Sequence, residues 1–201
     1  MDDEWTTVAG KKKKEEKKSS GVEYITKKTP IKLDVSEGPH TLNDQWICWF
    51  HDVNNENWGL SSYQQLITLD TIEDFWVLCN NIKNINGGMY YLMRRGYPPI
   101  WDHEKNIGGG GWTFKVDKKL AHEFWEKIAC YCIGETLCKD PENIIGVSIS
   151  PKVRFVTVRL WTKNDEKNAA EFVNIKKDTE NDSIVINFEN ARFTPNRDAA
   201  K

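Results

Sequence analysis

From His40 onward, the chain alternates short runs of aromatic and β-branched residues with polar segments. Such runs are typical of β-strands, whose side chains point alternately to the two faces of a sheet. The pattern predicts strands at 45–53, 63–69, 89–96, 111–116, 144–150, 153–162 and 183–188. A Pro-Lys turn separates 144–150 from 153–162, so these two strands are expected to form a hairpin.

Helical periodicity marks the segments between the strands, and three helices are predicted, at 71–82, 118–134 and 165–177. Thr71 and Asp117 stand where the N-caps of the first two helices would lie. Because strands dominate and short turns link most of them, the pattern predicts an α+β fold. In such a fold, helices pack one face of an antiparallel sheet.

The first 37 residues differ from the rest, because the segment KKKKEEKKSSG at 11–21 mixes charges without an apolar face. We expect residues 1–37 to form a disordered, charged N-terminal tail and residues 38–201 to form one folded domain. The basic tract could also serve as a nuclear address or an RNA-contacting arm, although its Glu pair dilutes the charge.

Composition limits the classes of partner. The net charge of the 201 residues is −2, so contact with a nucleic acid must come from a local basic patch. The five cysteines form no zinc-binding pattern and follow no secretory signal, which predicts reduced thiols in the cytosol or nucleus. No apolar run reaches the length of a membrane span, so no membrane contact is expected.

Nine tryptophans occur in characteristic surroundings along the chain. The segments that carry most of them are HTLNDQWICWF, NENWGL, IEDFWVLCNNI, PPIWDHEKNIGGGGW, FWEKIACYCIGE and RLWT. Over residues 38–195 this order resembles the eukaryotic translation initiation factor 4E family, which binds the messenger RNA cap. The resemblance implies a curved antiparallel sheet of about eight strands. It places the cap on the concave face of the sheet, and three helices on the convex face.

Trp58 and Trp101 match the family's pair of cap-stacking tryptophans, and both are predicted to lie on loops. A 7-methylguanine ring is cationic, so an indole on each side would bind it by stacking and by cation–π attraction. Trp46, Trp49, Trp112 and Trp125 fall in predicted strands or a helix, and we expect them in the core. Trp161 corresponds to the tryptophan on the methyl side of the base.

Asp102 follows the second stacking tryptophan directly. A carboxylate can accept hydrogen bonds from both N1–H and the N2 amino group of guanine and can balance the charge of the ring. The family usually has Glu here, and Asp is one methylene shorter. A shifted loop or a bridging water would then have to complete the contact.

The phosphates of a cap require cations, which the predicted hairpin supplies at Lys152, Arg154 and Arg159. Lys152 aligns with the family's phosphate-binding Arg, while Thr157 occupies the place of its Lys. Arg159 shares the strand parity of Trp161 and could substitute for that Lys. Gly111 replaces a family Arg, and we interpret the GGGG segment as a mobile loop that has lost a basic contact.

A partner surface is implied on the convex face, where the family binds a Tyr-x4-Leu-apolar helix of a scaffold protein. Ile72, Trp76 and Gly134 match this site, and His40 opens the segment that corresponds to the family's His-Pro-Leu entry. Glu126 stands in place of an apolar residue and Lys127 in place of an acid. The partner is therefore predicted to be non-standard, unless the protein binds caps without recruiting a scaffold.

The resemblance implies a monomeric cap-binding protein that recruits mRNA for translation initiation and needs no cofactor. The sequence contains no nucleophile–base motif, metal-ligand spacing or nucleotide-binding glycine motif, so an enzyme is not expected. Two alternatives stay open at this point. One is a cap-binding translational repressor, and the other is a family member that has an altered pocket and acts mainly through protein interactions.

Overall fold

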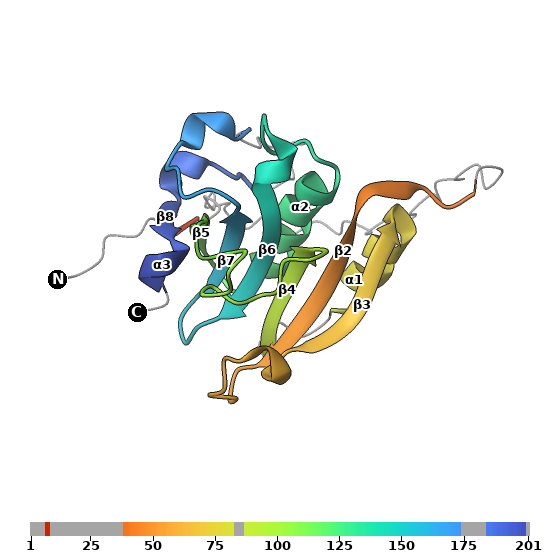
Figure 1. Cartoon of the computed structure of the whole chain (residues 1–201), viewed down its shortest axis with the longest axis horizontal. Helices are drawn as coiled ribbons and strands as arrows, with labels where there is room; N and C mark the ends of the chain where they lie inside the picture. The colour runs from red at the N-terminus through yellow and green to blue at the C-terminus, as the bar shows by residue number, and fades with distance from the viewer. Residues whose placement is uncertain (1–6, 9–37, 83–86, 174–183, 200–201) are drawn as a thin grey trace, which may run out of the picture.

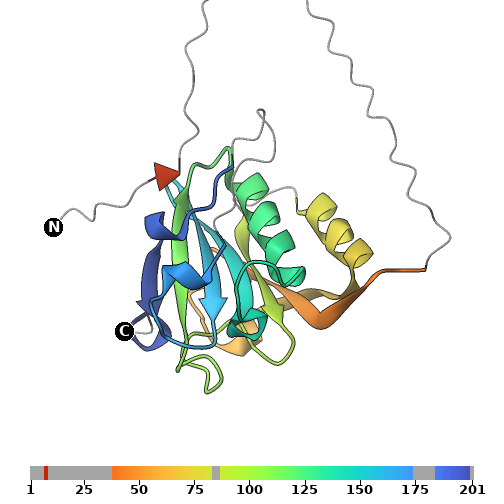
Figure 2. The ribbon, with the colours of Figure 1, turned by 90° about the horizontal axis from the view of Figure 1, so that it is seen from above.

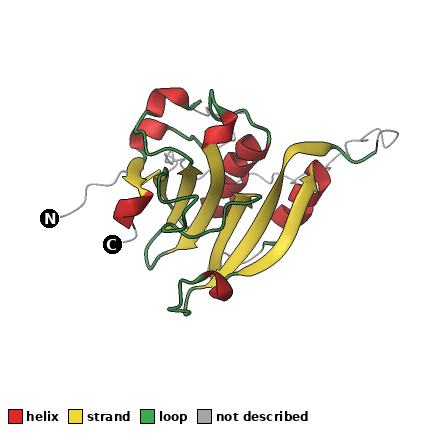
Figure 3. Cartoon of the chain, viewed as in Figure 1, coloured by secondary structure: helices red, strands yellow, loops and turns green. Residues whose placement is uncertain are grey.

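The computed structural model describes residues 7–8, 38–82, 87–173 and 184–199. Its strands form one curved sheet (Figures 1 and 3), in which β5, β7, β6, β4, β2 and β3 follow one another as neighbours. The short strands β1 and β8 both pair with β5. The strands are β1 (Thr7–Val8), β2 (Thr41–Asp52), β3 (Gln64–Thr71), β4 (Gly88–Arg94), β5 (Gly110–Val116), β6 (Ile144–Pro151), β7 (Val156–Thr162) and β8 (Arg192–Pro195).

All the strand pairs are antiparallel except β1 with β5, which is parallel. The predicted α+β class with a curved antiparallel sheet is therefore confirmed. The predicted hairpin is also present, because Ile149 pairs with Val158 and Pro151 with Val156 across β6 and β7.

Two helices, α1 (Ile72–Asn81) and α2 (Ala121–Ile133), cover one face of this sheet (Figure 2). Thr71 caps α1 as predicted: its hydroxyl accepts a hydrogen bond from the Asp74 backbone N–H, and the Asp74 carboxylate accepts one from the Thr71 N–H. This reciprocal capping box fixes the first residue of the helix directly after β3. No helix among the described residues is long and apolar enough to span a membrane.

The core has two parts, which lie on opposite faces of the sheet. The larger part fills the space between the sheet and the two helices, and includes the buried Trp46, Trp112 and Trp125 as predicted. Trp49, also expected in the core, is only partly buried and packs against the other part. A smaller cluster on the other face consists of Met89, Tyr91, Met93, Ile145 and Trp161. Along β4, Leu92 belongs to the first cluster and its neighbours Tyr91 and Met93 to the second, as the two-residue period of a strand requires.

The five cysteines form no disulfide in the structure, and four of them are buried. Burial raises the pKa of the Cys79 thiol to about 12, with smaller contributions from Glu126 and Cys130. Cys79 is therefore a neutral, apolar core side chain at physiological pH.

Several predicted elements differ from the structure. Within 165–177, where a helix was expected, the described part contains a three-residue 3-10 turn, Ala169–Glu171, and Phe172 then forms a bridge with Cys138. Within 183–188, where a strand was expected, the described residues 184–187 contain a single bridge residue, Ile186, and lead into a second 3-10 turn, Phe188–Asn190. Asp117 does not cap α2: its carboxylate accepts from the Lys119 N–H in a preceding turn, and the helix begins at Ala121.

The third helix of the structure, α3 (Asn196–Ala199), is only four residues long and follows β8 directly. Two further 3-10 turns, Leu60–Ser62 and Pro141–Asn143, precede β3 and β6. The N-terminal segment 1–37, predicted to be disordered, lies outside the described residues except for β1.

The glycine run is not the mobile loop that the sequence suggested. Gly109, Gly110 and Gly111 are buried, and β5 begins at Gly110. A Cβ atom at Gly111 would lie 2.6 Å from the Leu160 carbonyl oxygen and 2.7 Å from Arg159 Nε. Glycine is therefore needed here because β7 approaches too closely for any side chain.

Candidate functional site

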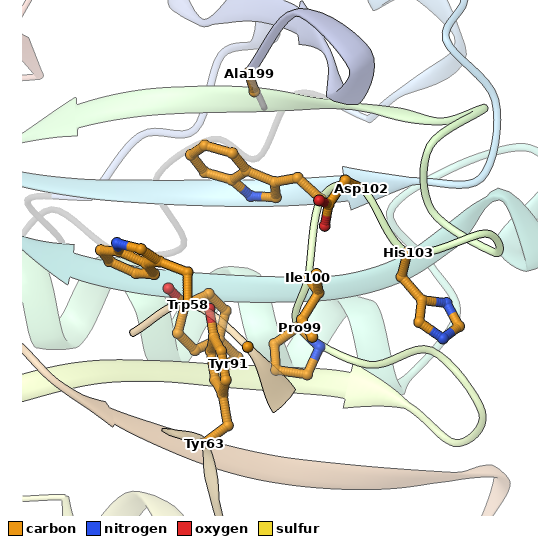
Figure 4. Close-up of a pocket in the computed structure, with 10 residues that line it drawn as sticks. Trp58, Tyr63, Tyr91, Pro99, Ile100, Asp102, His103 and Ala199 are labelled. Carbon is orange, nitrogen blue, oxygen red and sulfur yellow. The ribbon is translucent and has the colours of Figure 1, made fainter. Parts of the chain in front are cut away.

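A cavity of about 640 Å³ opens on the face of the sheet opposite α1 and α2 (Figure 4). Two loops form its sides, one between β2 and β3 and the other between β4 and β5. The residues that line it are Trp58, Gly59, Tyr63, Tyr91, Pro99, Ile100, Trp101, Asp102, His103 and Ala199. The structure therefore brings Trp58, Trp101 and Asp102 together, as the sequence analysis expected.

Trp58 projects from a loop that its own asparagines shape. The side-chain oxygen of Asn55 accepts from the Asn57 N–H at 2.9 Å, and that of Asn57 accepts from the Gly59 N–H at the same distance. Such Asx turns fix the backbone on either side of the indole. Trp58 is 54% exposed, so much of its ring surface is available to a ligand.

His51 supports Trp58 from within the protein. The two rings are stacked, with centroids 4.5 Å apart and planes 4° from parallel. His51 is fully buried, and its Nε2 lies 2.9 Å from the Asn57 carbonyl oxygen, so Nε2 is the nitrogen that carries the proton. The His51 ring behind the indole restricts the orientation of the Trp58 ring plane. His51 could not be identified from the sequence, because a single histidine in a strand does not indicate a binding role.

Trp101 follows Pro98 and Pro99, and the loop around it is closed by a buried amide. Asn106 Nδ2 lies 2.6 Å from the Pro98 carbonyl oxygen and 2.7 Å from that of Ile100, so it donates to both. The indole is 39% exposed. Its ring centroid lies 6.3 Å from that of Trp161.

Asp102 is exposed and lines the cavity beside Trp101. A carboxylate in this place can accept hydrogen bonds from a ligand held between the two indoles. Its neighbour His103 also lines the cavity and contributes Nδ1 to a turn with the Lys105 N–H.

Two tyrosines, which the sequence analysis did not single out, add phenol groups to the cavity. Tyr63 and Tyr91 make an edge-on ring contact, with centroids 5.5 Å apart. Burial raises the pKa of Tyr91 to about 12, and burial is also the main cause that raises the pKa of Tyr63, with smaller contributions from Tyr91 and Asp102. Both phenols are therefore neutral at physiological pH and can donate or accept hydrogen bonds.

Trp161 lies beneath the cavity rather than on its wall. It is fully buried, and its Nε1 donates to the Ser148 hydroxyl at 3.0 Å. Tyr91 packs against it, with ring centroids 6.2 Å apart. The methyl-side contact expected of Trp161 is not available to a ligand in this arrangement.

Of the three predicted phosphate-binding residues, the structure sets Arg159 apart. Lys152 and Arg154 are exposed in the turn between β6 and β7. Arg159 is only 8% exposed and donates to protein oxygens of Thr113, Thr194 and Asn196. As predicted from its strand parity, Arg159 shares the side of Trp161, but it is not a free surface cation.

The residues predicted for partner binding lie on the helical face. Ile72 and Trp76 are 42% and 44% exposed on α1, and Val77 beside them is 53% exposed, which leaves an apolar surface uncovered. His40 Nδ1 is 2.8 Å from Glu73 Oε1. On α2, Glu126 lies 3.9 Å from His122 Nδ1 and is followed by Lys127, and Gly134 caps the C-terminus of the helix.

Comparison with known proteins identifies the family. The family model described as "Eukaryotic initiation factor 4E" matches residues 41–201. The chain is 31% identical over 171 residues to "Eukaryotic translation initiation factor 4E" of Dictyostelium discoideum, covering 79% of this chain and 65% of the relative. It is 30% identical to "Eukaryotic translation initiation factor isoform 4E-2" of Zea mays, covering 81% of each chain.

Among solved structures, the Ascaris suum eIF4E-3 complex with m2,2,7G cap aligns with a TM-score of 0.59 at 30% identity, covering 65% of this chain and 77% of that one. The complex of C. elegans eIF4E-3 with the 4E-binding protein Mextli and cap analog aligns with a TM-score of 0.58 at 27% identity, covering 63% and 76%. The chain spans 65% of the Dictyostelium relative and 54% of eukaryotic translation initiation factor 4E-3 of C. elegans. The match over residues 41–201 shows that the chain belongs to the eukaryotic initiation factor 4E family.

Proposed function

We propose that this protein binds the 7-methylguanosine cap of mRNA between Trp58 and Trp101, and thereby recruits mRNA for translation initiation in the cytoplasm. The observation that carries the proposal is that two exposed indoles, from separate loops, line one cavity together with a carboxylate. The structural neighbour from Ascaris suum was solved with a cap bound. The proposed role is binding rather than catalysis.

The chemistry of the cavity suits a cationic purine. Two indoles can stack on the two faces of the ring, and each base–aromatic stack contributes about 1–3 kcal/mol. Asp102 can accept from the Watson–Crick edge of the guanine and balance its charge. The exposed Lys152 and Arg154 are the cations that we propose for the phosphates, since Arg159 already donates to the protein.

A binding titration with 7-methyl-GTP, and with GTP as the unmethylated control, tests the proposal. We expect Trp58→Ala and Trp101→Ala each to weaken binding of the methylated ligand by about 5- to 140-fold, the equivalent of one stack. Trp76→Ala is the matched control, because Trp76 is similarly exposed but lies on α1. Near-parental affinity in both loop variants, or equal affinity for GTP, would contradict the proposal.

Asp102 can be tested in the same titration. Asp102→Asn replaces one acceptor oxygen by a donor that faces the N–H groups of guanine, so we expect a roughly tenfold or larger loss, as for a hydrogen bond to a charged group. Asp102→Glu restores the longer carboxylate and is expected to bind as well as the parent or better. If neither change has an effect, another group recognises the base.

A second function, protein recruitment, is favoured by the uncovered apolar surface of Ile72, Trp76 and Val77. We propose that a helix of a scaffold or binding protein packs on this surface, between α1 and α2. The C. elegans neighbour was solved with a 4E-binding protein. Because Glu126 and Lys127 give α2 an unusual charge pattern, the partner helix should carry a basic residue opposite Glu126 or an acidic residue opposite Lys127.

A further inference from the structure

Arg159 is a buried guanidinium without a carboxylate partner among the described residues. Its Nη2 donates to the Thr194 carbonyl oxygen at 3.0 Å and to Asn196 Oδ1 at 2.8 Å, and its Nη1 lies 3.3 Å from the Thr113 hydroxyl. Burial lowers the pKa of Arg159 to about 10, so the group is still protonated at physiological pH. The protein thus buries a cation whose described hydrogen-bond partners are all neutral groups. Removing the charge from water costs free energy, which these groups offset only if they are firmly held.

The cation lies against the tryptophan of the cavity wall. The central carbon of the Arg159 guanidinium is 5.7 Å from the ring centroid of Trp101 and 5.6 Å from that of Trp161. A cation at this range attracts the face of an indole, more strongly where water is excluded. The absence of a side chain at Gly111 gives Arg159 the space to reach this position.

Asn196 joins Arg159 to the loop that carries Trp101. The side chain of Asn196 is fully buried, and its two ends make different contacts. Oδ1 accepts from Arg159, while Nδ2 donates to the Asn106 carbonyl oxygen at 2.8 Å. The Asn196 backbone N–H donates in addition to the Gly109 carbonyl oxygen at 2.9 Å.

Asn106 completes the connection, because its own side chain donates to the carbonyl oxygens of Pro98 and Ile100. These two residues flank Pro99, and Ile100 directly precedes Trp101. Asn106 is also fully buried. A continuous set of hydrogen bonds therefore runs from the C-terminal segment, through two asparagines, to the backbone that orients the indole.

We infer that Asn196 is a positioning residue for Trp101: it holds Arg159 against the indole and fixes the 98–106 loop, so that this wall of the cavity is arranged before a ligand arrives. Trp58 has separate support from His51, so the two walls are held independently. Arranging the wall in advance reduces the entropy lost on binding. The effect on cap affinity rests on the proposed function, whereas the effect on Trp101 itself does not.

Fluorine NMR of the full chain labelled with 5-fluorotryptophan reports the surroundings of each indole, through its chemical shift, without a ligand. The nine tryptophans give nine signals, and Trp101→Phe and Trp58→Phe identify the two of interest. Asn196→Ala removes both side-chain contacts. Asn196→Asp keeps an acceptor for Arg159 but replaces the donor to Asn106, and it is nearly isosteric. Asn190→Ala, at an exposed asparagine in the same part of the chain, is the control.

We expect both Asn196 variants to shift or broaden the Trp101 signal and to leave the Trp58 signal in place. Affinity for 7-methyl-GTP should fall by at least about fivefold, the equivalent of one net hydrogen bond, and by no more than Trp101→Ala causes. An unchanged Trp101 signal in Asn196→Asp would overturn the inference, as would an equal shift of the Trp58 signal. If the parent fails to bind 7-methyl-GTP while the Trp101 signal still responds to Asn196, the proposed function fails and the positioning role stands.

Discussion

The glycine run allows the same substitution to be made at two sites with opposite surroundings. At Gly111, an added methyl group would lie 2.6 Å from the Leu160 carbonyl oxygen, a backbone atom held in the β5–β7 ladder. At Gly108, three residues earlier, nothing lies within 4 Å of the added methyl, and the backbone conformation is open to any residue. We therefore expect Gly111→Ala to destabilise the fold and Gly108→Ala to leave it unchanged or slightly stabilised.

The magnitudes follow from general values for overpacking and for glycine replacement. Gly111→Ala should lower the free energy of unfolding by about 1–3 kcal/mol, since β7 must shift to relieve the contact. For a chain of this size, the melting temperature should fall by roughly 2–12 °C. Gly108→Ala should raise the free energy of unfolding by at most about 1 kcal/mol, because alanine restricts the unfolded chain.

Urea denaturation of the parent and the two variants, followed by tryptophan fluorescence, measures both changes. A thermal melt by circular dichroism gives an independent value. If the free energies of unfolding of the two variants agree within about 0.5 kcal/mol, the strands at Gly111 have room for a side chain. The idea that close approach of β7 requires glycine there would then be wrong.

Three further predictions concern the two faces of the molecule. His51→Ala should weaken cap binding about two- to tenfold, the value of one aromatic pair, while His51→Phe should keep most of the affinity; equal titration curves for both would argue against support of Trp58 by a ring. Replacing Lys152 and Arg154 together by Ala should reduce the preference for triphosphate over monophosphate caps and its dependence on salt; an unchanged preference places the phosphate contacts elsewhere. On the helical face, Glu126→Leu with Lys127→Glu should strengthen binding of a standard Tyr-x4-Leu peptide, measured by calorimetry. The double change removes the Glu126 carboxylate, which a docked apolar side chain would desolvate, and the Lys127 charge, which would repel a basic residue of the peptide. Tight binding to the parent that the double variant leaves unchanged would refute this reasoning.

The elements that could be predicted from the sequence are those marked by signals between neighbouring residues. Thr71 and Asp74 are three residues apart in the chain, so the capping box of α1 could be expected from the sequence alone. The strands that became β2 and β4 contain consecutive aromatic and branched residues, which few other structures accommodate. The candidate stacking tryptophans were identified because they match the family's stacking pair and stand in predicted loops, and the structure places both on the cavity.

The sequence was less informative where distant contacts decide the structure. Residues 165–173 have helix-forming composition, yet Phe172 packs on Trp112 and Phe188 in the core and ends the turn before a helix can form. The role of the glycines could not be seen because it depends on the approach of β7. Asn106 and Asn196 are 90 residues apart, and only the fold brings them into contact.

The arrangement of strands around β5 also bears on how the protein resists self-association. The outer side of β5 is paired with β8 at Gly110–Thr113 and with β1 at Lys115–Val116. Among the described strands, the short β1 and β8 form the edge at one end of the sheet, and β3 forms the edge at the other. A register shift in the β2–β3 ladder, between Cys48 and Trp49, interrupts that edge, and β3 carries Gln and Asp side chains that discourage pairing with another chain. A chain shortened before Arg192 would lose β8 and leave the backbone of Gly110–Thr113 unpaired at the edge of the sheet, which would favour aggregation.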